Sequence, residues 1–148
     1  MDKKDFLKTI NDCFKRQGCF KVKRKYVFRM QNMFVAFMVI RSDYCDCYYI
    51  DYNFVVKGAH PNVTVETVSE RDFDMVVQPR LKLADGSVRL KPEDLSQRVF
   101  EQNLNASISH VLKQMQSMDL DYIRALLKPG REYEISRVAA LVLGLKHY

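Results

Sequence analysis

The chain has 148 residues, of which 47% are hydrophobic and 28% are charged, and its net charge is +6. This length and balance predict one globular domain over residues 1–148 and exclude a globally disordered chain. No apolar run approaches the roughly 18 residues needed to cross a bilayer, and the charged residues 1–5 lack the apolar core of a secretory signal. We therefore expect a cytoplasmic protein that does not engage a membrane.

The first helix is expected at residues 3–17. Phe6, Ile10 and Phe14 recur at the spacing of one helical face. Asp2 is suited to cap the start, and Gly18 is suited to end the helix in a left-handed conformation.

A sheet is expected next. Residues 20–29 nearly alternate between polar and apolar, which predicts either one strand or a loop and a strand. Residues 33–40 are continuously apolar, which predicts a central strand covered on both faces. Residues 47–57 predict a third strand, with one core face and one mixed face whose composition leaves open whether it meets water.

The following stretch is expected to extend the sheet. Residues 63–74 predict either a short strand or an irregular connection, and residues 75–83 predict a strand that Pro79 confines to an edge or a bulge. Asp85 and Gly86 form a turn signal, after which residues 88–90 are expected to add a short strand segment.

The C-terminal half is expected to be helical. Pro92 is suited to the first position of a helix that reaches Met118, with a weak point at residues 103–105. Asp119 is suited to cap a short helix that ends before Pro129. A last helix is expected over residues 132–146, with Gly144 in its interior.

A helix followed by strands and then helices is the order of an α+β domain. We predict an N-terminal helix, an antiparallel sheet of three to five strands and a C-terminal helical half. The predicted core comprises Phe6, Ile10, Phe14, Phe34, Ala36, Met38, Ile40, Tyr48, Ile50, Tyr52, Phe54, Leu95, Val99, Ile108, Leu112, Val138, Leu141 and Val142.

The order of these elements resembles an uncharacterised family of small bacterial proteins that is known only as a domain of unknown function. The resemblance begins with Lys4, Phe6, Ile10 and Phe14, and continues with a glycine turn before the segment 20–21. It includes the segments 40–44 and 48–51, and the C-terminal segment 139–144 is compatible with it. It implies an α+β fold and brings no activity, cofactor or catalytic residues.

No cofactor or metal site is expected. The five glycines are scattered singly, so a phosphate-binding loop is absent. Cys45 and Cys47 form a C-x-C that lacks a zinc-site spacing, and free thiols are expected in a reducing cytosol. A thiol–histidine pair with His60 is the less favoured alternative. The carboxylate pairs Asp72/Asp74 and Glu132/Glu134 are interpreted as solvated.

Two groups of side chains are candidate binding sites. Tyr49, Asp51 and Asn53 project from one face of the third strand and would suit a polar ligand if that face is concave and open. The second group consists of basic residues near the aromatic residues Phe20, Tyr26 and Phe28, a mixture that suits single-stranded nucleic acid. Its members are Lys21, Lys23, Arg24, Lys25 and Arg29.

The positive charge of the chain supports the second group. Residues 1–29 contain ten Lys or Arg and three Asp, a net charge of +7, whereas residues 30–148 have a net charge of −1. Such asymmetry is typical of proteins with polyanionic partners, although a solvated helix face and a lysine-rich edge strand give the same pattern.

The sequence does not specify a biochemical function. The favoured hypothesis is a non-enzymatic binding or protein-interaction module, immunity-type or regulatory, with a protein partner or a second copy covering the exposed sheet face. The alternatives are nucleic-acid binding through the basic N-terminal segment, and an enzyme or small-ligand binder that uses the polar sheet face.

Overall fold

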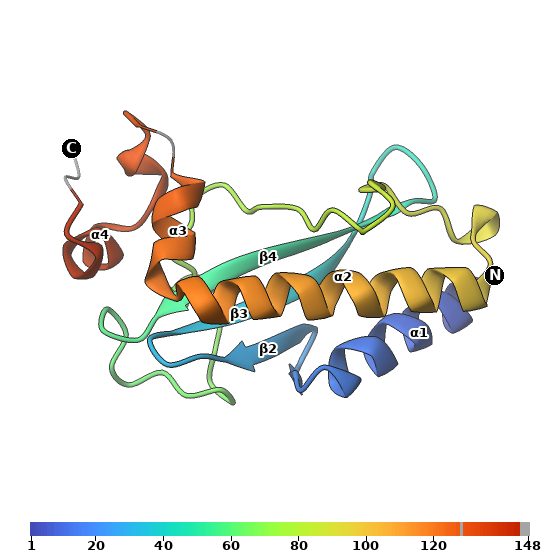
Figure 1. Ribbon diagram of the computed structural model, residues 1–148, viewed down its shortest axis with the longest axis horizontal. Coiled ribbons are helices and arrows are strands. Elements are labelled where there is room, and N and C mark those ends of the chain that lie inside the picture. The colour runs from blue at the N-terminus through green and yellow to red at the C-terminus, as the bar shows by residue number, and fades with distance from the viewer. Residues whose placement is uncertain (128, 146–148) are drawn as a thin grey trace.

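The computed structural model describes residues 1–127 and 129–145, and it confirms the α+β order of elements. The helix α1 precedes four strands, and the helices α2, α3 and α4 follow a long irregular segment (Figure 1). The bounds are α1 Lys3–Arg16, β1 Phe20–Val22, β2 Lys25–Arg29, β3 Met33–Arg41, β4 Tyr48–Val56, α2 Gln97–Met118, α3 Leu120–Leu126 and α4 Arg137–Leu143. Short 3₁₀ helices lie at Glu70–Asp72, Pro92–Asp94 and Glu132–Glu134.

The sheet is an antiparallel meander in the order β1-β2-β3-β4. The alternating segment 20–29 forms two strands, because Lys23 and Arg24 turn the chain between them. The predicted central strand is β3, which is hydrogen-bonded to β2 on one side and to β4 on the other. The long helix α2 crosses one face of the sheet with α1 beside its N-terminal half, while α3 and α4 lie at the opposite end (Figure 1).

The helix-facing side of the sheet carries the main core. Phe14 of α1 lies 4.9 Å from Phe37 of β3 between ring centroids, and Phe6 lies 5.3 Å from Phe100 of α2. Helix α1 therefore packs aromatic rings both against the sheet and against α2. The predicted core face of β4, which runs from Tyr48 to Val56 in alternate residues, is buried in this cluster.

The opposite side of the sheet is covered by the chain itself. Val65 and Val68, from the irregular segment after β4, pack against Phe34, Ala36 and Val55. The mixed face of the third strand, whose exposure the sequence leaves open, is therefore covered and not open to water. Residues 63–74 form the irregular connection that was one of the two alternatives.

Residues 75–83 do not form the predicted strand. They run along the free edge of β4 and pair with it only locally, where the Leu81 amide donates to the Ile50 carbonyl at 2.7 Å and the Tyr52 amide donates to the Pro79 carbonyl at 3.0 Å. Pro79 has no amide hydrogen, so it cannot continue a ladder. The predicted segment 88–90 is likewise reduced to a single bridge between Leu90 and Tyr48.

The helical half differs from its prediction at three boundaries. Pro92 opens a 3₁₀ turn, and the extended Leu95 separates that turn from α2, which begins at Gln97 and continues unbroken through residues 103–105. Asp119 makes no side-chain cap to α3. The last helix is shorter than predicted, and Gly144 ends it in a left-handed conformation with φ of 70°. Lys146 lies outside the described residues.

Five predicted core residues are exposed. They are Ile40, Val99, Val138, Leu141 and Val142. Ile40 lies at the end of β3, beyond the covering segment, and Val99 lies on the outer flank of α2. On α4, Val138 and Leu141 are exposed and Ala139, Ala140 and Leu143 are buried, while the partly exposed Val142 packs against Gly58 in the segment after β4. No helix in the described ranges combines the length and apolarity of a transmembrane span.

Candidate anion-binding groove

A groove of about 770 Å³ lies between α1, the β1–β2 hairpin and the adjoining ends of β3 and β4. The helix α1 contributes Lys3, Lys8 and Lys15 to its wall. At a rise of 1.5 Å per residue, the distance from Lys3 to Lys15 along the helix axis is about 18 Å. Lys8 and Lys15 flank the apolar stripe that buries Phe6, Ile10 and Phe14, and Lys3 lies at the N-terminal end of that stripe, so the packing of α1 on the sheet determines where they point.

The hairpin forms the second wall with Lys21, Lys23 and Arg24. Lys21 pairs with Tyr26 across the two strands, so both side chains face α1, and the Lys21 ammonium lies 5.8 Å from the centre of the Tyr26 ring. Lys23 and Arg24 form the turn. Lys23 has φ of 56°, in the left-handed region that favours glycine, so this lysine is held at some conformational cost.

The floor of the groove is uncharged and rigid. The Tyr26 ring stacks on Phe14 at 4.8 Å, and its hydroxyl donates to Asn11 Oδ1 at 3.1 Å. Burial, with a smaller contribution from Asp12, raises the pKa of Tyr26, so the hydroxyl stays protonated at neutral pH. Leu7 and Val39 supply the apolar part of the floor.

The electrostatics of the groove are strongly one-sided. Arg41 at the end of β3 brings the lining to seven Lys or Arg, and the lining contains no Asp or Glu. Lys8 pairs with Asp12 at 3.4 Å, and Arg41 pairs with Asp46 at 2.6 Å. Within the described chain, the other five cations have no carboxylate within 4.0 Å. The groove is therefore suited to an anion that brings several negative charges.

The structure separates the predicted polyanion-binding residues. Lys21, Lys23 and Arg24 meet in the groove, but Lys25 and Arg29 point to the opposite face of the sheet, because Lys25 pairs with Met38 and Arg29 with Phe34. Lys25 is buried there, and Arg29 lies beside a separate hollow with Lys57.

The predicted aromatic partners do not offer free faces in the groove. Tyr26 is buried against Phe14, and Phe28 is half-buried against the main core. Phe20 is 52% exposed, but it pairs with Val27 and therefore points to the opposite face of the sheet. The groove thus presents charge and shape without a platform for stacked bases.

Four residues of the groove were not among the predicted site residues: Lys3, Lys8 and Lys15 of α1, and Arg41 of β3. At 3.6 residues per turn, Lys8 and Lys15 form a basic stripe on one flank of the predicted helix, whereas Lys3 lies about 140° from Lys8 around the axis, on the apolar side. The sequence has no signal that this stripe faces the hairpin, since that depends on how α1 docks on the sheet. Arg41 likewise joins the groove only through the pairing of β3.

The predicted polar ligand site is occupied by the chain's own groups. The Arg80 guanidinium lies 3.9 Å from the centre of the Tyr49 ring, and its Nε donates to Asp51 at 3.2 Å. Burial raises the pKa of Asp51, and the Arg80 ion pair opposes that rise. Tyr49, Asp51 and Asn53 do not line the groove or the four hollows of about 220–480 Å³ elsewhere on the described chain.

Asn53 replaces a missing strand. It is 1% exposed, its amide donates to the Met75 carbonyl at 3.0 Å, and its Oδ1 accepts from the Met75 amide at 3.0 Å. These two bonds reproduce the pairing that a neighbouring strand would give to Met75. The side chain thus holds the irregular segment against β4.

Asp74 continues this connection, and the interpretation that its carboxylate is solvated is wrong. It is 1% exposed and accepts from the Val56 amide at 2.7 Å, from Ser136 Oγ at 2.6 Å and from His60 Nε2 at 2.8 Å. Ser136 donates to the carboxylate and not to the imidazole, so the arrangement is a clasp and not a nucleophile–base pair. A buried carboxylate needs such partners because desolvation is costly.

The cysteines also differ from the prediction. Cys45 and Cys47 form a disulfide in the turn before β4, whereas Cys13 and Cys19 are free and buried. The alternative pairing of a thiol with His60 is also wrong. His60 lies beyond the far end of β4, a strand of nine residues that separates it from the cysteines by about 30 Å. Within the ranges that the structure covers, no group of three or more His, Cys, Asp or Glu could hold a metal ion.

Comparisons with protein-family models, with curated proteins and with solved structures found no match for this chain. The resemblance to a bacterial family therefore stays a prediction from the sequence.

Replacing Asn53 with alanine is expected to lower the free energy of unfolding by about 1–3 kcal/mol, because it leaves the buried amide and carbonyl of Met75 without partners. Urea unfolding followed by circular dichroism measures the change. Asn62→Ala, at an exposed loop position, is the matched control and should change stability by less than about 0.5 kcal/mol. Equal stabilities of the two variants would show that Asn53 does not hold the segment in place.

Proposed function

We propose that this protein is a non-enzymatic cytoplasmic binding module whose groove takes the phosphate backbone of a nucleic acid. The observation that carries the proposal is the cation-lined groove, with seven basic side chains and no carboxylate in its lining. Phosphate groups held at regular intervals match cations spread over about 18 Å of helix. A single small anion would leave most of these cations without a partner.

The chemistry of the groove favours contacts to the backbone over contacts to the bases. Lysine ammonium groups and one or two guanidinium groups bind phosphate through charge, with little dependence on sequence. The aromatic rings that would stack on bases are buried or face the other side of the sheet. We therefore propose binding that tolerates many sequences and weakens steeply as salt increases.

Neutralising the hairpin wall is expected to weaken binding and its salt dependence together. In the variant Lys21→Gln/Lys23→Gln/Arg24→Gln, three phosphate contacts are lost. The slope of log K against log salt for a single-stranded oligonucleotide should therefore become shallower by about 2. Fluorescence anisotropy at several salt concentrations measures both quantities.

The matched control for this variant is Arg89→Gln/Arg98→Gln/Lys113→Gln, which removes the same charge from exposed positions outside the groove. The control should keep the slope of the wild-type protein. If both variants lose the same affinity and slope, net charge and not the groove causes binding. If the wild-type protein has no measurable salt-dependent binding, the proposed function is wrong.

The strained turn residue gives a second test. Lys23→Gly relieves the left-handed backbone and is expected to raise the free energy of unfolding by up to about 1 kcal/mol. The same change removes a cation from the groove and should weaken oligonucleotide binding. Urea unfolding and anisotropy on one preparation measure the two effects. A variant that is more stable and binds as well as the wild-type protein would remove Lys23 from the site.

A protein contact is the second candidate function, and exposed apolar side chains at the other end of the molecule favour it. Val138, Leu141 and Val142 share one face of α4, and their exposed fractions are 49%, 78% and 40%. Tyr133 is also exposed nearby in the sequence. The occupant that we propose for this face is a second copy of the chain, since a short apolar helix face can pair with itself about a two-fold axis. A dimer through the sheet is not proposed, because the segment after β4 already covers that face.

Light scattering coupled to size exclusion tests this second candidate. We expect the wild-type protein to approach the dimer mass as its concentration rises, and Leu141→Lys to stay monomeric. Val99→Lys is the control, because Val99 is also apolar and exposed, at 62%, but lies on α2. A wild-type protein that stays monomeric throughout would exclude pairing through α4.

A further inference from the structure

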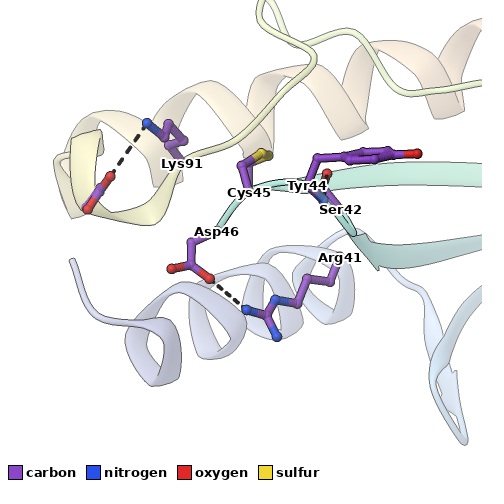
Figure 2. The surroundings of a disulfide bond; sticks show 8 residues. Arg41, Ser42, Tyr44, Cys45, Asp46 and Lys91 are labelled. Atoms are coloured by element: carbon purple, nitrogen blue, oxygen red, sulfur yellow. Dashed lines mark hydrogen bonds and ion pairs between the residues drawn. A yellow bond between two sulfur atoms is a disulfide. The ribbon is translucent and has the colours of Figure 1, made fainter.

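The turn between β3 and β4 contains a disulfide that joins two cysteines separated by one residue. Cys45 and Cys47 are bonded, and Asp46 lies between them. The turn is closed by the Ser42 amide, which donates to the Cys47 carbonyl at 2.9 Å, and Ser42 Oγ accepts from the Tyr44 amide at 3.1 Å. Figure 2 shows the Cys45 sulfur on one side of the turn and the Asp46 carboxylate on the other, directed toward Arg41.

This disulfide does little for the stability of the fold. A crosslink stabilises a protein mainly by lowering the conformational entropy of the unfolded chain, and this effect is smallest for the shortest loops. A ring that contains only one intervening residue therefore adds less than a crosslink between distant elements. The core of β3 and β4 is already fixed by strand pairing along nine residues of each strand.

The two sulfurs differ in access. Cys45 is half-buried at the surface of the turn, whereas Cys47 is fully buried at the start of β4. Thiol–disulfide exchange needs a thiolate to approach one sulfur in line with the bond that breaks. The attack is therefore directed to Cys45, and Cys47 is the leaving group.

We propose that Cys45–Cys47 is a thiol–disulfide exchange site that reacts reversibly with a small thiol of the glutathione class. A thiolate attacks Cys45 Sγ, the bond between the two cysteines breaks, and the electron pair leaves on Cys47 Sγ, which takes up a proton. A second thiol then attacks the small-molecule sulfur of the mixed disulfide and releases Cys45 as a thiol. The protein disulfide gains two electrons and two protons, and two thiols become one small-molecule disulfide.

The site is connected to the groove through Asp46, and this consequence rests on the proposed function. The Asp46 carboxylate accepts from Arg41 at 2.6 Å, and Arg41 lines the groove. In the oxidised protein, the bonds on both sides of Asp46 are held in a closed ring, which keeps the carboxylate on Arg41. Reduction opens the ring, releases Asp46 and frees Arg41 for a phosphate.

The exchange step is tested by alkylation and mass spectrometry. Native protein equilibrated in a glutathione buffer at the cytosolic redox poise should gain a rapid label at Cys45, and the buried Cys47 should be labelled at least about ten times more slowly. Cys13 and Cys19 are internal controls, because burial raises their pKa values to about 11 and about 12 and keeps them unreactive. If the disulfide persists in this buffer and yields only to strong dithiol reductants, it is structural and the proposal is wrong.

Single substitutions test the direction of attack. Cys47→Ser leaves the accessible Cys45 and should capture one glutathione from oxidised glutathione as a mixed disulfide. Cys45→Ser leaves the buried Cys47 and should react at least about ten times more slowly, because the thiol lacks access. Equal rates for the two variants would overturn the assignment of Cys45 as the attacked sulfur.

The connection to the groove is measured by anisotropy with a single-stranded oligonucleotide on oxidised and reduced protein. Reduction should tighten binding by about two- to five-fold, which is the range for one exposed ion pair. Asp46→Asn should give the tighter affinity in both redox states. Equal affinities of oxidised and reduced wild-type protein would overturn the connection. An absence of binding in both states would overturn the proposed function, while the alkylation result decides the exchange site by itself.

Discussion

The second face of the sheet is covered by a segment without regular structure, and the rest of the molecule depends on how that segment is held. Buried backbone groups must find hydrogen-bond partners, and an irregular chain cannot supply them to itself. Asn53 supplies them for Met75, and Asp74 supplies them for Val56 while also holding His60 and Ser136. Because the chain covers this face, β3 is buried on both sides, and α1 and α2 pack on the other side, where α1 forms the groove with the β1–β2 hairpin.

The elements that the sequence predicts well are those with a strong local pattern. The run from Met33 to Ile40 is apolar at every position, so it predicts a doubly covered strand, and it is one except for its exposed end at Ile40. Residues 75–83 have the composition of a strand, but the Asn53 side chain takes the bonding position that a ladder would use. The Asn53 side chain thus makes the hydrogen bonds that a paired strand would make. This is a tertiary effect, and no local sequence pattern predicts it.

The sequence predicts the region of the groove and some of its basic residues, but not the whole lining. The charge asymmetry of residues 1–29 identifies the right region, and three of the five predicted basic residues line the groove. Lys25 and Arg29 were misplaced because the sequence leaves open whether residues 20–29 form one strand or two. Once Lys23 and Arg24 are known to be a turn, strand alternation assigns Lys21 to the α1 side and Lys25 to the other. The α1 lysines can be assigned to the groove only when the position of α1 on the sheet is known, and that position is determined by tertiary packing.

The distribution of charge argues that the groove has been kept for binding. Five cations without carboxylate partners surround one hollow, and their mutual repulsion disfavours the folded state. A merely solvated surface would intersperse carboxylates, as residues 30–148 do with fourteen basic and fifteen acidic residues. Lys23 adds a strained backbone to the same wall. An anion that fills the groove relieves this repulsion, so binding stabilises the folded protein. The repulsion among the cations in the unbound protein is therefore the source of part of the binding free energy.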